Sequence, residues 1–478
     1  MSAAAKAIAS LDLKRRALSL GAVKAFDHAL QFLLPVVLVR SLDTATFGEY
    51  RLLWLALGTV MAFAPLNMPG SLFFFVPRSE PGRRRRYVHN TMLFLLAAGV
   101  VGGIATGPWN GLLPEAVAPL EPYGALVPLF VAAWIAAVLL DVLPTVDERI
   151  GWQAAATVGV SLLRTVLVGT AAWVTGDLRV MLWVLVATAL VKLVVLALYV
   201  QRHHGLRKSW FERGQFSEQF RHAAPFGASN ALYALRGQAD QWVAASLFAL
   251  SSFAAFSIAA IVSQVVLVFR HAVLDAFLPS MSRLQASGDL RGMMEMNARG
   301  NVLVANALFP LLAFTFAFAE DIVAFIYTAA YLEAAPAMRV YIVGMVALVV
   351  EVGSVVLLLR QGVFALWFGA IVLVVAVAVS WSAAQHVGLA GAAAGSVCAV
   401  YLDRFIMLRR VSRLTGIGLG ALQNWRELAR AALFSVLAAA AAWAVVEPLV
   451  EPVLWRLVLG AALIAAVYGA AQFRRLRA

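Results

Sequence analysis

Eight ionisable residues lie inside long apolar stretches of this sequence, namely Lys24, Asp27, Arg164, Lys192, Arg236, Asp240, Arg270 and Asp275. A charged side chain at the centre of a membrane-spanning helix costs roughly 2.5–3.5 kcal/mol on insertion scales, so these residues must face one another or water. Five of them are cations and three are anions. Arginine offers a bidentate fork, and lysine a point charge, to phosphate or carboxylate. The excess of positive charge therefore predicts an anionic ligand.

The spacing of these charges indicates which of them share a helix face. Arg236 and Asp240 are four residues apart in the segment LYALRGQADQWV (232–243) and lie on one face of a helix. Arg270 and Asp275 are five apart and lie only loosely on one side. For Asp240 and Asp275, a structural ion pair that holds helices together and a role toward a ligand or coupling ion both remain open.

Three more positions have two interpretations each. Asp27 and the adjacent His28 have titratable chemistry suited to a proton relay, whereas a neutral, hydrogen-bonded His28 would serve packing alone. Lys192 could extend to the inner membrane surface. Arg51 is expected at the outer end of the second apolar segment, either as an interfacial anchor or as a contact for the ligand.

The elements that must position these charges are transmembrane helices. The chain has 478 residues, 62% hydrophobic and 13% charged, and its mean hydropathy is +0.85, whereas soluble domains contain about 25% charged residues. A helix needs ~20 apolar residues to cross a bilayer. The sequence predicts an all-α polytopic membrane protein with about 14 transmembrane helices. The expected segments are 17–40, 48–66, 87–107, 122–144, 151–175, 179–201, 221–249, 252–278, 297–318, 337–359, 362–384, 387–411, 428–447 and 453–472.

The distribution of basic residues predicts the orientation of these helices. Lys and Arg in short loops favour the cytoplasmic side, and most of them fall in the segments that are cytoplasmic if the N-terminus is inside. Both termini are therefore expected in the cytoplasm, and the net charge of +13 is mainly a topology signal. The run RRRR at 83–86 is interpreted as an anchor at membrane lipids rather than a nucleic-acid site, and no removable signal peptide is expected.

Several function classes are disfavoured by what the loops contain. No expected loop exceeds about twenty residues, which leaves no room for a folded extramembrane domain and argues against an enzyme such as a glycosyltransferase or polymerase. The acidic pair in AEDI (319–322) is explained by topology. Cys398 is the single cysteine and the seven histidines are dispersed, so we expect no disulfide, no metal site and no cofactor.

A short internal repeat predicts the domain organisation. Phe47 and Tyr50 in SLDTATFGEY (41–50) have the same spacing as Phe253 and Phe256 in SLFALSSFAAF (246–256). Two six-helix lobes related by a pseudo-two-fold axis along the membrane normal are therefore expected. The predicted parts are an N-terminal lobe at 1–201, a cytoplasmic linker at 202–220, a C-terminal lobe at 221–411 and two additional C-terminal spans at 412–478.

Five stretches carry a resemblance to a known family. They are LPVVLVRSLDTATFGEYRLLWLA (34–56), GSLFFFVPR (70–78), PFGASNALYALRGQADQWVAASLF (225–248), FLPSMSRL (277–284) and YLEAAPAMRVYIV (331–343). Together they resemble the polysaccharide-export, Wzx-like flippases of the multidrug/oligosaccharidyl-lipid/polysaccharide (MOP) superfamily. The resemblance covers most of the chain and is weakest in the last two segments.

This resemblance implies a MATE-like fold and a function. Such a protein would move a polyprenyl-pyrophosphate-linked oligosaccharide from the cytoplasmic to the outer leaflet of the bacterial inner membrane, by alternating access through a central cationic cavity. In the related lipid II flippases the cavity cations lie on the first, second and eighth spans, where this chain has Lys24, Arg51 and Arg270. Asp240 stands where members often carry an aspartate, and the glycine that often follows it is replaced by alanine here.

The expected substrate contacts are Lys24, Arg51, Arg164, Arg236 and Arg270, and the expected coupling or structural carboxylates are Asp27, Asp240 and Asp275. A polysaccharide polymerase and a ligase are the implied partners. Two alternatives remain within the superfamily. A multidrug exporter of organic cations, coupled to protons or sodium through Asp27, would need an acidic cavity, whereas a lipid II flippase would need similar cationic chemistry.

Overall fold

The computed structural model describes residues 3–111, 113–205 and 211–476, except for the side chains of 3–20, 24, 264–265, 268, 271–272, 274–275 and 471–476. All regular secondary structure in these ranges is helical. The chain divides into two compact units, Met1–Leu235 and Arg236–Ala478, and the boundary falls within one long helix, α9 (Arg213–Leu247). The lobe and linker boundaries expected from the sequence stay a prediction.

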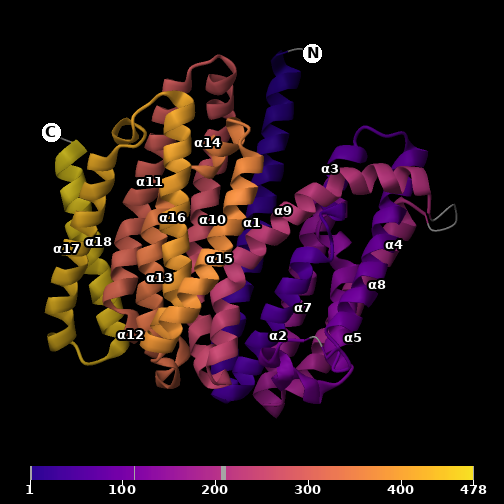
Figure 1. Cartoon of the computed structure of the whole chain (residues 1–478), viewed down its shortest axis with the longest axis horizontal. Helices are drawn as coiled ribbons and strands as arrows, with labels where there is room; N and C mark the ends of the chain where they lie inside the picture. The colour runs from indigo at the N-terminus through magenta and orange to yellow at the C-terminus, as the bar shows by residue number, and fades with distance from the viewer. Residues whose placement is uncertain (1–2, 112, 206–210, 477–478) are drawn as a thin grey trace. The chain divides into compact units, whose positions relative to one another are not determined.

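Unit 1 is a bundle in which α1 lies beside α7, α4 packs on α5, and α8 contacts both α5 and α7 (Figure 1). Its elements before α9 are α1 (Ala3–Ser41), α2 (Thr44–Phe63), α3 (Met68–Phe75), α4 (Pro81–Ala105), η1 (Glu115–Tyr123), α5 (Leu126–Ala136), η2 (Ala137–Asp141), α6 (Leu143–Val146), α7 (Ile150–Thr175) and α8 (Leu178–His203).

The helix ends of unit 1 follow from local chemistry. Asp43 caps α2 by accepting hydrogen bonds from the backbone N–H groups of Ala45 and Thr46. Between α2 and α3, Leu66 and Asn67 have positive φ angles of 40° and 56°, and the helix axis bends by 43°. Gly227 of α9 packs on this bend, where an added Cβ would lie 2.5 Å from the Leu66 carbonyl carbon. A glycine is therefore required for α9 to pass so close.

Unit 2 is a second bundle, in which α10 lies beside α11 and α13, α16 packs on α13 and α15, and the hairpin α17–α18 packs on α11 (Figure 1). After α9 its elements are α10 (Leu250–Ala286), α11 (Leu290–Ala317), α12 (Ala319–Tyr327), η3 (Ala329–Tyr331), α13 (Ala334–Val349), α14 (Gly353–Leu358), α15 (Gly362–Val387), α16 (Leu389–Thr415), η4 (Leu419–Ala421), α17 (Trp425–Leu449) and α18 (Val453–Leu476). The approach of α15 to α16 depends on Gly391, because a Cβ there would lie 2.1 Å from the Ala383 carbonyl oxygen.

Each of the fourteen expected segments falls on helical residues. Within the described ranges, ten helices are long and apolar enough to span a membrane, or eleven if the bent pair α2–α3 counts as one span. The multi-pass, all-helical architecture is thus confirmed, and the count of fourteen spans stays a prediction.

Two expected segments are interrupted, and one of the breaks has a clear polar cause. The segment 337–359 is divided into α13 and α14 at Val350–Val352. The Glu351 backbone N–H donates to Asn301 Oδ1 at 3.1 Å, and the Glu351 carboxylate accepts from the Ser354 backbone N–H at 3.2 Å. The second interrupted segment, 122–144, continues from α5 into the 3-10 turn η2, which ends at Asp141.

Candidate functional site

Arg164 of α7 is the most unusual buried charge of unit 1. Its side chain is 9% exposed, and its guanidinium carbon lies 5.5 Å from the ring centroids of both Trp54 on α2 and Trp134 on α5. The Nε of Arg164 is buried without a hydrogen-bond partner in the described part of the chain. None of the ion pairs among the described residues includes Arg164. Its charge is therefore supported by aromatic faces and is not neutralised by a carboxylate.

The two tryptophans form an angled pair that sets the position of this guanidinium. The ring centroids of Trp54 and Trp134 are 5.6 Å apart with an interplanar angle of 88°. Cation–π contacts stabilise a cation by about 0.5–2 kcal/mol, far less than the hydration that a buried guanidinium loses. A bound anion would supply the missing compensation.

Lys192 of α8 contacts the same tryptophan but has a partner of its own. Its Nζ lies 4.8 Å from the Trp134 ring centroid and 2.6 Å from Asp141 Oδ2. Lys192 is buried, whereas the Asp141 side chain is 50% exposed. This ion pair accounts for Lys192 without an extension to the membrane surface.

Asp27 of α1 is linked to the same helix as Arg164. The Asp27 carboxylate accepts hydrogen bonds from Gln31 Nε2 at 2.8 Å and from the hydroxyl of Ser161. Ser161 precedes Arg164 by three residues on α7, which places the two on neighbouring parts of one face. The side chain of Lys24 lies outside the described residues.

In unit 2, Arg236 makes an ion pair that its spacing did not predict. Arg236 Nη1 lies 3.0 Å from Oδ1 of Asp403 on α16, and Arg404 Nη1 lies 3.6 Å from the other oxygen of Asp403. The Asp240 carboxylate, which shares a helix face with Arg236, accepts from the Tyr341 hydroxyl at 2.7 Å and from the Ser396 hydroxyl at 2.5 Å. Helix packing therefore engages both residues of the i, i+4 pair with other elements.

Arg270 of α10 is 4% exposed, and its Nη1 donates to the Leu348 carbonyl oxygen at 3.2 Å. Leu348 lies in the last turn of α13, where the free carbonyls favour a cation. Arg51 is half-buried near the start of α2. The side chain of Asp275 lies outside the described residues, so its role as a structural or coupling carboxylate stays a prediction.

Sequence reasoning missed three carboxylates that lie inside the expected segments, namely Asp141, Glu351 and Asp403. It also missed the cation Arg404. When these residues are included, cations and anions are equal in number, so the predicted excess of positive charge is not kept. Their positions within apolar segments were a signal that could have found them. The case for an anionic ligand therefore rests on the surroundings of Arg164 and not on the total charge.

A separate polar cluster is centred on Asp147, which lies between α6 and α7. Asp147 Oδ2 accepts from the Tyr199 hydroxyl at 2.9 Å and lies 2.7 Å from His204 Nε2. Burial raises the pKa of Asp147, but the hydrogen bonds from His204 and Tyr199 and the charges of His204 and Arg84 together outweigh it. The pKa of Asp147 therefore lies below its ordinary value. This cluster joins the end of α8 to the turn before α7.

A family model described as polysaccharide biosynthesis protein matches residues 13–285, more than half of the chain. No curated protein matches the sequence significantly. Among solved structures, the lipid II flippase MurJ in an inward closed conformation matches with a TM-score of 0.69 and 11% identity, covering 96% of this chain and 99% of that one.

Two other solved structures extend this likeness. The Vibrio cholerae MATE transporter VcmN matches with a TM-score of 0.55 and 13% identity, covering 86% of this chain and 99% of that one. A MOP superfamily transporter from Pyrococcus furiosus matches with a TM-score of 0.52 and 14% identity, covering 84% and 97%. At identities this low, the structural similarity establishes a shared fold and nothing finer. The expected MATE-like fold is confirmed.

Proposed function

The chain belongs to the polysaccharide biosynthesis protein family, and from this premise we propose that it is a flippase for a lipid-linked oligosaccharide. In this proposal it moves a polyprenyl-(pyro)phosphate-linked oligosaccharide from the cytoplasmic to the outer leaflet by alternating access. The family membership and the MOP fold agree with the prediction that the protein is a transporter and not an enzyme.

The surroundings of Arg164 carry this proposal. This guanidinium is buried against two indole rings. In the part of the chain that the structure describes, its Nε has no hydrogen-bond partner and no carboxylate forms an ion pair with it, which supports the binding of an anion. A phosphate accepts two parallel hydrogen bonds from arginine, and such charge-assisted bonds are about twice as strong as neutral ones. An organic cation would be repelled at this position, which disfavours the multidrug-exporter alternative.

The other expected contacts take different roles in the proposal. Lys24, Arg51 and Arg270 would bind the substrate together with Arg164, while Arg236 would bind only when its ion pair with Asp403 opens. Asp27, Asp240 and Asp275 would hold the helices or bind a coupling ion. A proton or a cation at Asp27 would alter its hydrogen bond to Ser161 and so would act on α7 itself.

The proposal is tested by depleting the protein in its native cells and measuring lipid-linked oligosaccharide on the cytoplasmic leaflet. Rescue is attempted with the wild type, Arg164→Leu, Arg164→Lys and Arg270→Ala, each at matched membrane abundance. Arg179→Leu is the control, because Arg179 is exposed and donates to the Pro122 carbonyl oxygen away from the buried charges.

We expect depletion to cause lipid-linked oligosaccharide to accumulate on the cytoplasmic leaflet. The wild type and Arg179→Leu should remove this accumulation, Arg164→Lys should reduce it in part, and Arg164→Leu should leave it unchanged. Accumulation of lipid II alone would reassign the substrate to peptidoglycan synthesis. No accumulation of either lipid, together with raised sensitivity to organic cations, would overturn the proposal in favour of a multidrug exporter.

A further inference from the structure

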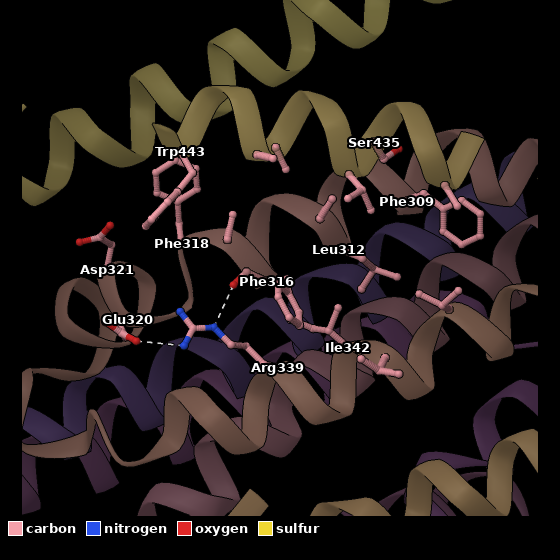
Figure 2. Close-up of a pocket in the computed structure, with 18 of the residues that line it drawn as sticks. Phe309, Leu312, Phe316, Phe318, Glu320, Asp321, Arg339, Ile342, Ser435 and Trp443 are labelled. Atoms are coloured by element: carbon pink, nitrogen blue, oxygen red, sulfur yellow. Dashed lines mark hydrogen bonds and ion pairs between the residues drawn. The ribbon is translucent and has the colours of Figure 1, made fainter. Parts of the chain in front are cut away.

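A groove of about 700 Å³ lies between α11, α13 and α17, entirely within unit 2 (Figure 2). Its walls are apolar along most of its length, with Phe309, Leu312 and Ile342 from α11 and α13 on one side. On the α17 side the lining is mostly small, including Ala432, Ser435, Ala439 and Ala440. Large residues facing small ones leave a long apolar slot, which has the shape and polarity of an acyl-chain site.

One end of this groove carries charged residues from α12, α13 and α18. Arg339 Nη1 lies 2.9 Å from Glu320 Oε1, and the Arg339 Nε donates to the Phe316 carbonyl oxygen (Figure 2). Arg456 Nη2 lies 3.2 Å from Asp321 Oδ1. The Nε of Arg456 is buried without a hydrogen-bond partner in the described part of the chain. The protein therefore leaves one arginine donor at this end without a partner among the described residues.

Glu447 also lines this end, and it has no ion-pair partner among the described residues. Two arginines and three carboxylates consequently give this end a net charge of about −1 at neutral pH. Glu447 lies in the last turn of α17, where the carbonyl groups add further negative potential. The net charge of this end therefore favours a ligand that carries a cationic group.

Trp443 lies one turn before Glu447 on the same face of α17 and lines the same end of the groove (Figure 2). Its side chain is 46% exposed, so its ring is accessible. Tryptophan is the best of the aromatic residues at binding an ammonium group over its face. Trp443 and Glu447 thus offer a ring face and a carboxylate to one ammonium group.

We propose that this groove binds a zwitterionic aminophospholipid. One acyl chain lies in the apolar slot, the ammonium group contacts Trp443 and Glu447, and the phosphate lies beside the partly exposed side chain of Arg456. This site is independent of the proposed transport function, because all the residues that line it belong to unit 2 and none of them is an expected substrate contact. It would hold a membrane lipid whether or not the protein flips an oligosaccharide.

The experiment is a titration of the delipidated full-length protein in detergent, with bound lipid counted by native mass spectrometry. The probes are palmitoyl-oleoyl phosphatidylethanolamine, phosphatidylglycerol with the same chains, and undecaprenyl phosphate. Glu447→Gln tests the ammonium contact, with the exposed Glu451→Gln as its control. Ala440→Trp fills the groove, and Ala441→Trp, an exposed neighbour that does not line it, is the control for adding a large residue.

We expect the wild type to bind the ethanolamine lipid roughly fivefold more tightly than the glycerol lipid, since an exposed charge contact contributes up to about 1 kcal/mol. Glu447→Gln should remove that preference, and Ala440→Trp should weaken binding of both phospholipids, while both controls behave as the wild type. Equal or tighter binding of either anionic lipid by the wild type would overturn the proposal. Binding that Ala440→Trp leaves unchanged would overturn it too, because the lipid would then lie elsewhere.

Discussion

The two units stabilise a buried arginine in different ways. In unit 1, Arg164 lies against two indole rings, and no described carboxylate forms an ion pair with it. In unit 2, Arg236 lies 3.0 Å from a carboxylate that a second arginine, Arg404, also faces. Ring faces hold a guanidinium in place without cancelling its charge, whereas a carboxylate cancels it. The first arrangement suits the binding of an anion and the second suits the joining of helices.

Removal of the shared carboxylate should have the largest effect. Asp403→Asn leaves Arg236 and Arg404 without their carboxylate in a largely buried setting, and breaking such a pair costs about 3–5 kcal/mol of unfolding free energy. Thermal unfolding in detergent measures it. The control is Glu295→Gln, whose 4.0 Å pair with Arg299 is exposed and contributes at most about 1 kcal/mol. Equal losses for both variants would mean that Asp403 is not structural.

Loss of the Lys192 ammonium group in unit 1 should reduce the unfolding free energy by a smaller amount. Lys192→Met removes a charge-assisted hydrogen bond of about 1.5–3 kcal/mol, but the Asp141 side chain is 50% exposed and can be hydrated. Asp141→Asn should cost more, because it leaves the buried ammonium group without its carboxylate. Unfolding in detergent gives both values, and the reverse order would show that Lys192 reaches water.

Arg164→Leu should separate function from stability. Among the described residues, the substitution removes cation–π contacts of about 0.5–2 kcal/mol. It also relieves the desolvation of a buried charge, so the unfolding free energy should change by about 1 kcal/mol or less. Rescue of oligosaccharide flipping should fail. Arg236→Leu should show the opposite pattern, with reduced stability because Asp403 remains buried. Similar behaviour of the two variants in both measurements would contradict the comparison between the units.

The smallest expected effect concerns pH and the Asp147 cluster of unit 1. The pKa of Asp147 is lowered in the folded protein, so its contribution to stability is present above the unfolded pKa of about 3.9 and is lost as pH falls through the lower folded value. Between pH 5 and pH 3 the wild type should therefore lose more thermal stability than Asp147→Asn. The exposed Glu115→Gln variant should follow the wild type. If Asp147→Asn loses as much thermal stability as the wild type over this pH range, the ionisation of Asp147 is not the cause of the loss.

Much of the fold could be predicted because it depends on properties that are local in the chain. Apolar segments long enough to cross a bilayer specify helices wherever they occur, and all fourteen expected segments fall on helical residues. The interruption at Glu351 was missed because its cause is Asn301 on α11, a residue 50 positions away. The resemblance in five short stretches pointed to the family and the fold that the comparisons support.

The sequence by itself determined that this protein is a multi-pass helical membrane protein with charged residues inside its helices. Only the tertiary structure decided which of those charges are neutralised. Asp403 lies 167 residues from Arg236 in the chain, and Trp134 contacts Arg164 and Lys192 from a third helix. Helical periodicity specifies which residues share a face, but the partners of that face depend on how helices pack, and that arrangement is set by contacts distributed over each whole unit.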